Sequence, residues 1–266
     1  MHQELARAGY AVFAITYDRQ VDLKAFADKQ GVDYPILSDE GSRVIRELGI
    51  LDEDLEVHHA RFGVPTRPEQ HGVAYPMTFV LDETGRIERK IVEENYRSRY
   101  GGRLLLEELT GTPALRDTRG TEHSMTASQG IVSARAWLDS PTYFAYQRVG
   151  LHVEVTVQPG WHVYSPEVPP GYTGLRIEVQ SAPPGLRSGQ PRWPEAKPFR
   201  VEGLTEEFSV YEGTVGITDP VDFVVNRGPG PVRLEISLGF QVCSETECLP
   251  PATVSLSLTV PEGPVP

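Results

Sequence analysis

The only two cysteines of this chain, Cys243 and Cys248, lie in the stretch FQVCSETECLPP with four residues between them. Two thiols at this spacing can form a structural disulfide, supply part of a metal site, or cycle between dithiol and disulfide. A zinc site usually takes four ligands, and no histidine lies near the pair in the sequence, which disfavours a metal. The structural disulfide and the redox pair remain as alternatives.

The small stabilisation expected from a disulfide between these cysteines favours a redox role over a structural one. Closing a loop of about six residues stabilises a protein by only about 2 kcal/mol in the chain-entropy model. A domain of ordinary size buries a sufficient core without such a bond. Glu245 and Glu247 lie between the sulfurs and should raise a thiol pKa. We therefore predict a pair that is attacked by the low-pKa thiolate of a partner, if one sulfur is accessible.

Composition narrows the classes of partner. The chain has 266 residues, a formal net charge of −12 and a pI near 5.1. Nucleic acids and anionic membranes bind basic surfaces, so neither is an expected partner. No apolar run approaches the roughly 18 residues of a membrane-spanning helix. The N-terminal stretch MHQELARAGY also lacks the basic and then apolar layout of a signal peptide.

The first half of the chain alternates between strand and helix patterns, which predicts an α/β layout with a mixed sheet. Gly31 is expected to end one helix and Ser38 with Asp39 to begin the next. The expected elements are a buried strand at 11–17, a helix at 21–31, a second amphipathic helix within 34–50, a hairpin at 77–94 around an Asp-Glu-Thr-Gly turn, and a helix at 103–109.

The second half of the chain has a different pattern of apolar and polar residues. Strict alternation of apolar and polar residues occurs at 151–157, 233–240 and 253–260, with Pro and Gly clusters between these stretches. Such short alternating strands predict an antiparallel β-sandwich. Residues 111–127 are polar and without periodicity, as is typical of a linker. We thus predict one domain at 1–110 and another at 128–262.

The stretch AYPMTFVLDETGRI, residues 74–87, resembles the AhpC/TSA family of redoxins. The resemblance extends through residues 9–18, 26–50 and 94–100. It implies a thioredoxin-like α/β domain over 1–110. It also implies that Pro76 follows a cis peptide bond and that Pro76 and Thr78 belong to a loop that contacts substrate.

One departure from this family is large. Redoxins carry their reactive cysteine at the start of the first helix, whereas this chain begins inside that helix and has no cysteine before Cys243. The central strand is missing too, so two apolar strands should face a gap. We expect that Met1 is not the natural start and that a longer chain supplies a signal peptide, that strand and a cysteine motif. The alternative is a degenerate redoxin kept as a binding module. Residues 1–110 alone should have no thiol or peroxidase chemistry.

Residues 161–171, 206–213 and 240–258 resemble the immunoglobulin-like N-terminal domain of the DsbD family of thiol:disulfide interchange proteins. The resemblance implies a periplasmic β-sandwich whose cysteine pair exchanges electrons with thioredoxin-like proteins. Cys243 and Cys248 match that pair, and no cofactor is implied. Four further positions match the surroundings of the pair: Phe208 as an aromatic cap on a nearby loop, Trp161 and Tyr164 in an aromatic stretch, and Pro250 directly after the cysteines.

We therefore predict a thioredoxin-like domain followed by an all-β immunoglobulin-like sandwich that performs thiol–disulfide exchange in the bacterial cell envelope. The partner would be a thioredoxin-like protein or the complete N-terminal domain of a longer chain. The alternative is a non-catalytic binding or scaffold protein with an inert disulfide.

His58, His59 and His71 have no recognisable ligand spacing and are expected to be solvated loop residues, so we predict no metal site.

Overall fold

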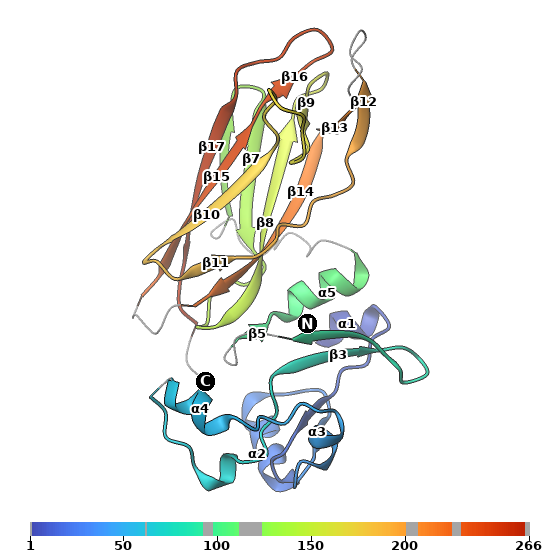
Figure 1. The fold of residues 1–266 in the computed structure, drawn as a ribbon, viewed down its shortest axis with the longest axis vertical. Helices are drawn as coiled ribbons and strands as arrows, with labels where there is room; N and C mark the ends of the chain where they lie inside the picture. Colours follow the sequence, from blue (N-terminus) through green and yellow to red (C-terminus); the bar gives the residue numbers. More distant parts are fainter. Residues whose placement is uncertain are drawn as a thin grey trace. The chain divides into compact units, whose positions relative to one another are not determined.

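The structure is a computed structural model that describes residues 2–61, 63–92, 98–111, 124–200, 207–224 and 230–263. Strands predominate in it, and helices are few and short. The chain divides into two compact units, Met1–Tyr100 and Gly101–Pro266. Figure 1 shows the helices and strands of each unit, coloured from the N-terminus to the C-terminus.

The first unit is made of short helices and short strands (Figure 1). Its elements are α1 (His2–Arg7), β1 (Ala14–Thr16), α2 (Gln20–Gln30), β2 (Ile36–Ser38), α3 (Arg43–Glu47), α4 (Leu55–Arg61), the 3₁₀ helix η1 (Pro68–Gln70), β3 (Met77–Leu81), β4 (Ile87–Val92) and β5 (Arg99–Tyr100).

The helix boundaries of this unit follow from local chemistry. Gly31 ends α2 with a left-handed φ of 65°, and its N–H donates to the carbonyl of Ala27, which confirms the predicted cap. Asp39 accepts hydrogen bonds from the N–H groups of Val44 at 3.1 Å and Ile45 at 2.9 Å. These bonds satisfy donors at the start of α3, which is shorter than the helix expected within 34–50.

The predicted hairpin is also present. β3 and β4 pair antiparallel from Met77–Val92 to Leu81–Ile87. The Asp82 side chain accepts from the backbone N–H groups of Thr84 at 2.8 Å and Arg86 at 2.9 Å, which closes the turn. The Asp-Glu-Thr-Gly stretch therefore predicted the turn correctly, because an aspartate side chain can accept hydrogen bonds from the backbone N–H groups that follow it.

The strands of the first unit form two separate ladders. β1 pairs with β2 in parallel, and β3 pairs only with β4 among the described residues. Phe13 and Ile15 are 61% and 41% exposed, and Leu37 on β2 is 49% exposed. A strand buried on both faces would hide such side chains. The strand expected at 11–17 is therefore shorter, Ala14–Thr16, and the prediction that both of its faces are buried was wrong.

The peptide bond before Pro76 differs from the expectation. The described residues contain one cis bond, at Ala182–Pro183, so the bond between Tyr75 and Pro76 is trans. The chain leading into Pro76 is held extended, because Tyr75 N–H donates to the carbonyl of Ile50 at 2.8 Å and Ala74 pairs with Leu51. This extended entry into β3 needs no reversal at Pro76. The implied cis bond was therefore wrong for this structure.

The second unit is built from strands after one helix (Figure 1). Its elements are α5 (Gly102–Thr110), β6 (Ser124–Gln129), β7 (Val132–Leu138), β8 (Gln147–Val157), β9 (His162–Tyr164), β10 (Arg176–Ala182), β11 (Leu186–Ser188), β12 (Lys197–Arg200), β13 (Glu207–Glu212), β14 (Thr214–Phe223), β15 (Val232–Phe240), β16 (Val242–Cys243) and β17 (Ala252–Val260).

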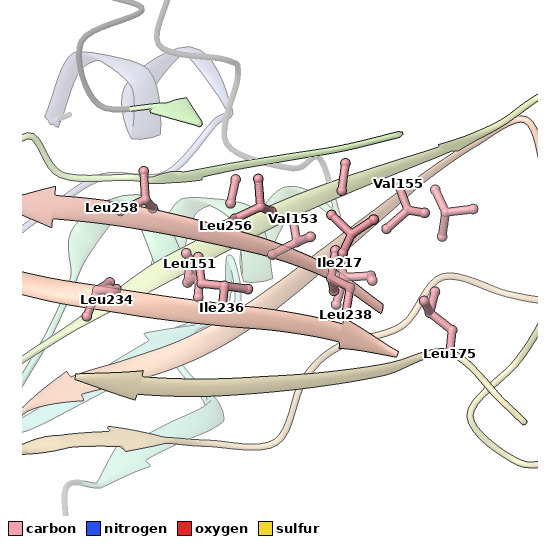
Figure 2. Close-up of a cluster of buried hydrophobic side chains, with 14 of the residues drawn as sticks. Leu151, Val153, Val155, Leu175, Ile217, Leu234, Ile236, Leu238, Leu256 and Leu258 are labelled. Carbon is pink, nitrogen blue, oxygen red and sulfur yellow. The ribbon is translucent and has the colours of Figure 1, made fainter. Parts of the chain in front are cut away.

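These strands form antiparallel sheets with the orders β11-β14-β8-β7-β6, β10-β15-β17 and β12-β13-β9-β16. The three alternating stretches predicted as strands became β8, β15 and β17, with every second residue buried along β15 and β17. Figure 2 shows the side chains of Leu151 and Val153 from β8 beside those of Leu234 and Ile236 from β15. Burial of each such side chain stabilises the fold by roughly 1.5–3 kcal/mol. The predicted sandwich is confirmed.

Helix α5 belongs to this second unit by its contacts. The Thr218 hydroxyl on β14 donates to Glu107 at 2.6 Å, and Arg192 donates to Glu108 at 2.6 Å. His152 on β8 is 2% exposed, and its Nδ1 lies 3.2 Å from the Thr218 hydroxyl. The contacts thus divide the chain after Tyr100, whereas the ranges 1–110, 111–127 and 128–262 remain predictions from sequence. Most of the predicted linker, residues 112–123, lies outside the described residues.

Within the described part of the chain, no helix is long and apolar enough to cross a membrane.

Candidate redox site

Cys243 and Cys248 form a disulfide with an S–S distance of 2.03 Å and a Cα–Cα distance of 4.0 Å. Cys243 ends the short strand β16, and Cys248 lies opposite it in an isolated antiparallel bridge. Leu249 N–H donates to the carbonyl of Val242 at 2.9 Å, which holds the two arms together. The pair therefore joins the two arms of a narrow hairpin.

The turn between the sulfurs is fixed by Ser244. Its backbone N–H donates to the carbonyl of Glu247 at 2.8 Å. Its hydroxyl oxygen accepts from the N–H groups of Thr246 at 3.2 Å and Glu247 at 3.1 Å. Glu245 and Glu247 are both exposed. The acidic spacer is thus a defined turn that presents two carboxylates to solvent beside the disulfide.

Gln241 anchors the arm that carries Cys248. Its amide Nε2 donates to the carbonyl of Leu249 at 3.2 Å, and its Oε1 accepts from Thr173 N–H at 3.2 Å. None of these bonds involves a sulfur atom. The hairpin can therefore keep its arms aligned when the disulfide is reduced.

The two cysteines differ sharply in exposure. Cys243 is 1% exposed, whereas Cys248 is an exposed residue. Exchange requires in-line access to the sulfur that is attacked. Cys248 is therefore the more accessible of the two cysteines.

A small aromatic cluster surrounds Cys243. Tyr164, Phe208 and Val210 are buried with it, and Tyr172 packs against the cluster. The Tyr164 and Phe208 rings lie 5.3 Å apart, and the Tyr172 and Phe208 rings 4.8 Å apart. This wall is apolar on the side of Cys243, so an ionised Cys243 thiolate would be poorly solvated there.

Tyr164 is the polar group that reaches the disulfide. Its hydroxyl oxygen lies 3.8 Å from Cys248 Sγ, within the range of a weak sulfur hydrogen bond. Burial raises the pKa of Tyr164 above its usual value, and the nearby Tyr172 adds to the effect. The hydroxyl therefore keeps its proton and is available as a donor to a thiolate.

The residues predicted to surround the disulfide lie in different parts of the second unit. Phe208 lies on strand β13 and not on a loop, and it shares the cluster of Cys243 and Tyr164. Trp161 instead packs against the main hydrophobic core, as an ordinary core aromatic does. Pro250 is exposed directly after the Cys248 arm.

Pro76 and Thr78 lie in the first unit, with Thr78 paired to Ile91 across the β3–β4 hairpin. The assignment of these two residues to a substrate loop, like the functional roles of the residues around the disulfide, remains a prediction from the family resemblance.

One residue beside the disulfide was not singled out from the sequence. His162 on β9 is the direct ladder partner of Cys243 on one side and of Glu212 on the other. The available signal was the alternation in WHVY, which places His162 on the same face as Tyr164. Its pairing with Cys243 depends on a register between segments about eighty residues apart, which the sequence does not display.

The three histidines of the first unit have ordinary partners. His58 and His59 lie in α4 and not in a loop, where His58 Nδ1 contacts Asp52 at 3.0 Å. His71 lies 3.3 Å from Glu56. The described residues contain no group of three or more His, Cys, Asp or Glu side chains suited to a metal ion.

Gly174 lies in the segment that connects Tyr164, at the end of β9, to strand β10. A Cβ atom at position 174 would collide with the carbonyl oxygen of Ser165 and lie 2.8 Å from that of Pro166. Backbone atoms cannot yield as a flexible side chain does. We expect Gly174→Ala to lower the free energy of unfolding by about 1–3 kcal/mol, as overpacking does. Urea unfolding of this variant beside Gly216→Ala tests the clash: Gly216 on β14 has no left-handed φ and no atom within 4 Å of its added Cβ. An equal loss in both variants would contradict the clash.

Comparison with known proteins gives one family for each part of the chain. Residues 1–90 match the family model described as the AhpC/TSA family. Residues 134–259 match the family model described as thiol:disulfide interchange protein DsbD, N-terminal. The comparison with curated proteins finds no match.

Solved structures similar to this chain include two from bacteria. One is the N-terminal periplasmic domain of ScsB from Proteus mirabilis, at 19% identity and a TM-score of 0.39, covering 53% of this chain and 54% of that chain. The other is the reduced DsbD N-terminal domain of Neisseria meningitidis, at 18% identity and a TM-score of 0.30, covering 42% of this chain and 78% of that chain.

The chain thus spans about half the length of the ScsB domain that it matches. Both resemblances stated from the sequence are confirmed as matches: one segment of the chain matches the AhpC/TSA family model, another matches the DsbD N-terminal family model, and the second segment contains the disulfide.

Proposed function

We propose that this protein performs thiol–disulfide exchange through Cys243 and Cys248 with a thioredoxin-like partner. The observation that carries the proposal is the asymmetry of the disulfide, with Cys243 1% exposed and Cys248 exposed. A purely structural bond has no need of one open sulfur, whereas an exchanging pair requires it. The match of residues 134–259 to the DsbD N-terminal family supports the same chemistry.

The exchange proceeds in two displacements. A partner thiolate attacks Cys248 Sγ, the Cys243–Cys248 bond breaks, and Cys243 leaves with the electron pair as a thiolate. A second partner thiolate then attacks the partner sulfur of the mixed disulfide and releases Cys248 as a thiolate. The partner is oxidised by two electrons and this chain is reduced by two. Delivery of electrons to a downstream disulfide is the same sequence in reverse.

The surroundings of the pair suit this role. Phe208 and Tyr164 are buried together with Cys243, whereas Cys248 is exposed and meets only the Tyr164 hydroxyl of this group. Leu249 is 37% exposed beside Cys248, and Pro250 follows it. A partner that reaches Cys248 therefore meets a short apolar arm flanked by Glu245 and Glu247. We infer that Phe208 acts as the cap of the buried thiol from within strand β13.

The first unit contributes a family match to the proposed function but no cysteine. Its match to the AhpC/TSA family supports a thioredoxin-like α/β domain over 1–110, with Pro76 and Thr78 in a substrate loop. Residues 1–110 contain no cysteine, so they supply no attacking thiolate. The thiol chemistry of the described residues is confined to the second unit.

The chemistry of the bond also supports a proposal for the compartment. Disulfides persist in oxidising compartments such as the bacterial periplasm and are reduced in the cytosol. Together with the DsbD N-terminal match, this supports a site of action in the periplasm or cell envelope. Blocking free thiols in intact cells and then locating the oxidised chain by fractionation tests this; recovery of the chain as a dithiol in the cytosol would contradict it.

A redox titration of the full chain tests the proposed function. We expect the Cys243–Cys248 bond to equilibrate with glutathione at a potential above about −300 mV, because structural disulfides typically lie below that value. Reduced thioredoxin should reduce the bond as well. The matched control is the double variant Cys243→Ser with Cys248→Ser, which should leave thioredoxin reduced. A bond that resists both reductants would favour the alternative function, a binding or scaffold protein with an inert disulfide.

A further inference from the structure

The four strands β12, β13, β9 and β16 bring three polar or reactive side chains into one row. Glu212 on β13 is the ladder partner of His162 on β9, and His162 is the ladder partner of Cys243 on β16. Residues directly opposite one another on antiparallel strands point to the same face with Cβ atoms about 4.5–5.5 Å apart. The row therefore places a carboxylate, an imidazole and a thiol side by side.

The burial pattern supports the shared face. Val163 and Val242 pair with each other and belong to the main core, whereas Tyr164 and Cys243 belong to the aromatic cluster. Because side chains alternate along a strand, His162 lies on the face of Tyr164 and Cys243. Its ring lies 5.6 Å from that of Tyr164.

His162 is an unusual residue to find there. It is 3% exposed, its ring lies 4.3 Å from that of Phe199, and its Nε2 is buried with no hydrogen-bond partner in the described structure. A buried ring nitrogen without a partner costs roughly 1–3 kcal/mol. A phenylalanine would fill the same space without that cost. Retention of an imidazole next to Cys243 therefore calls for a chemical role.

Cys243 needs a proton acceptor. To re-form the disulfide, its thiol must lose a proton before its sulfur can attack Cys248. The surrounding wall of Tyr164, Phe208 and Val210, which is apolar apart from the Tyr164 hydroxyl, disfavours the free thiolate. The proton must therefore pass to a nearby side chain as the sulfur attacks.

We propose that His162 is the acid–base residue of Cys243, an inference that rests on the proposed exchange function. The neutral imidazole accepts the Cys243 thiol proton while Cys243 Sγ attacks Cys248 Sγ in a mixed disulfide. The bond between Cys248 and the partner sulfur breaks, and the partner leaves as a thiolate with the electron pair. In the opposite direction, His162 first takes up a proton from solvent, and its imidazolium gives that proton to Cys243 as it leaves.

The charges that face His162 fit a proton acceptor. Burial lowers the pKa of His162, and Glu212 partly opposes that effect, so the ring is neutral at neutral pH and its imidazolium is stabilised when it forms. Glu212 is itself paired with Lys197 of β12 at 2.9 Å. Among the described residues, the other titratable groups on this face are Tyr164 of the same strand, Tyr172, which packs against Tyr164, and Cys243 of β16.

The test uses the reduced full chain and one equivalent of the disulfide of thionitrobenzoate, whose released thiolate is coloured. The exposed Cys248 attacks first and releases one thiolate; Cys243 then resolves the adduct and releases the second. We expect His162→Phe, which preserves the packing of a ring against Phe199, to leave the first release unchanged. The second release should slow by about 10²-fold at neutral pH, the lower end of general acid–base contributions.

The pH profile separates acid–base chemistry from packing. In the natural chain the rate of the second release should rise with pH and level off once His162 is neutral. In His162→Phe it should keep rising about tenfold per pH unit until the thiol itself ionises. Glu212→Gln retains the imidazole but removes the opposing charge, so the midpoint of the profile should move to lower pH. The matched control is His152→Gln, which replaces the buried histidine of β8 and should leave both releases unchanged.

A second release in His162→Phe that is as fast as in the natural chain, with the same pH profile, would overturn the acid–base role and leave the proposed function intact. An unmoved midpoint in Glu212→Gln would also count against it. A natural chain that cannot be reduced, or that releases no second thiolate, would refute the proposed function and this inference together.

Discussion

Cys243→Ser is expected to convert the protein into a covalent trap for its partner. The reduced variant retains the exposed thiol of Cys248, which attacks the disulfide of a partner, but it lacks the thiol that resolves the adduct. Resolution within one hairpin benefits from the high effective concentration of the neighbouring thiol. Its loss should slow release of the partner by more than about 10³-fold, so mixed disulfides should accumulate on non-reducing gels.

Cys248→Ser is the matched variant and should behave differently. It retains only Cys243, which is 1% exposed, and should form almost no adduct with the same partner. Equal trapping by the two variants would contradict the assignment of Cys248 as the accessible sulfur. Loss of stability does not explain the difference, because either variant removes the same disulfide, at a cost of about 2 kcal/mol for a loop of this size.

Asp139→Asn is expected to have a large, pH-dependent effect on stability. Burial raises the pKa of Asp139 to about 7 and Glu107 adds to the rise, whereas the Gly150 N–H and Arg103 oppose it. In the unfolded chain the pKa is near 3.8. Between pH 4 and 7 the unfolded chain has therefore lost a proton that the folded protein keeps.

This difference makes the free energy of unfolding fall as pH rises, by up to about 4 kcal/mol across this window at about 1.4 kcal/mol per pKa unit. Below pH 4 and above pH 7 the contribution is constant. An asparagine does not ionise, and its side-chain oxygen can still accept from Gly150 N–H. The variant should gain stability relative to the natural protein from pH 4 to 7.

Urea unfolding at several pH values, followed by tryptophan fluorescence, measures this gain. Glu178→Gln on β10 removes an exposed carboxylate from the same unit and is the matched control, which should show little change with pH. A stability difference between Asp139→Asn and the natural protein that is the same at pH 4 and pH 8 would contradict the raised pKa.

Several elements were predictable because their signals are local. Alternation at 151–157, 233–240 and 253–260 identified three strands of the sandwich, since period-two burial follows directly from strand geometry. Gly31 and the turn at Asp82 were also correct, because each depends on bonds within a few residues. The quoted stretches of both halves also sufficed to indicate the two family resemblances.

Other features depend on contacts that sequence patterns do not encode. Helix α5 was assigned to the first domain by its position in the chain, whereas Glu107 bonds Thr218 of the sandwich. Phe208 was expected on a loop and lies in a strand paired with β12. The peptide bond before Pro76 was expected to be cis and is trans in this structure.

By itself the sequence determined that all thiol chemistry of this chain passes through Cys243 and Cys248, because it contains no other cysteine. It also showed that a short acidic spacer separates them. Only the tertiary structure decided that Cys248 is open, that Cys243 is closed, and that His162 faces Cys243. Exposure and ladder register arise from packing between segments distant in the chain, so no local pattern specifies which sulfur a partner reaches.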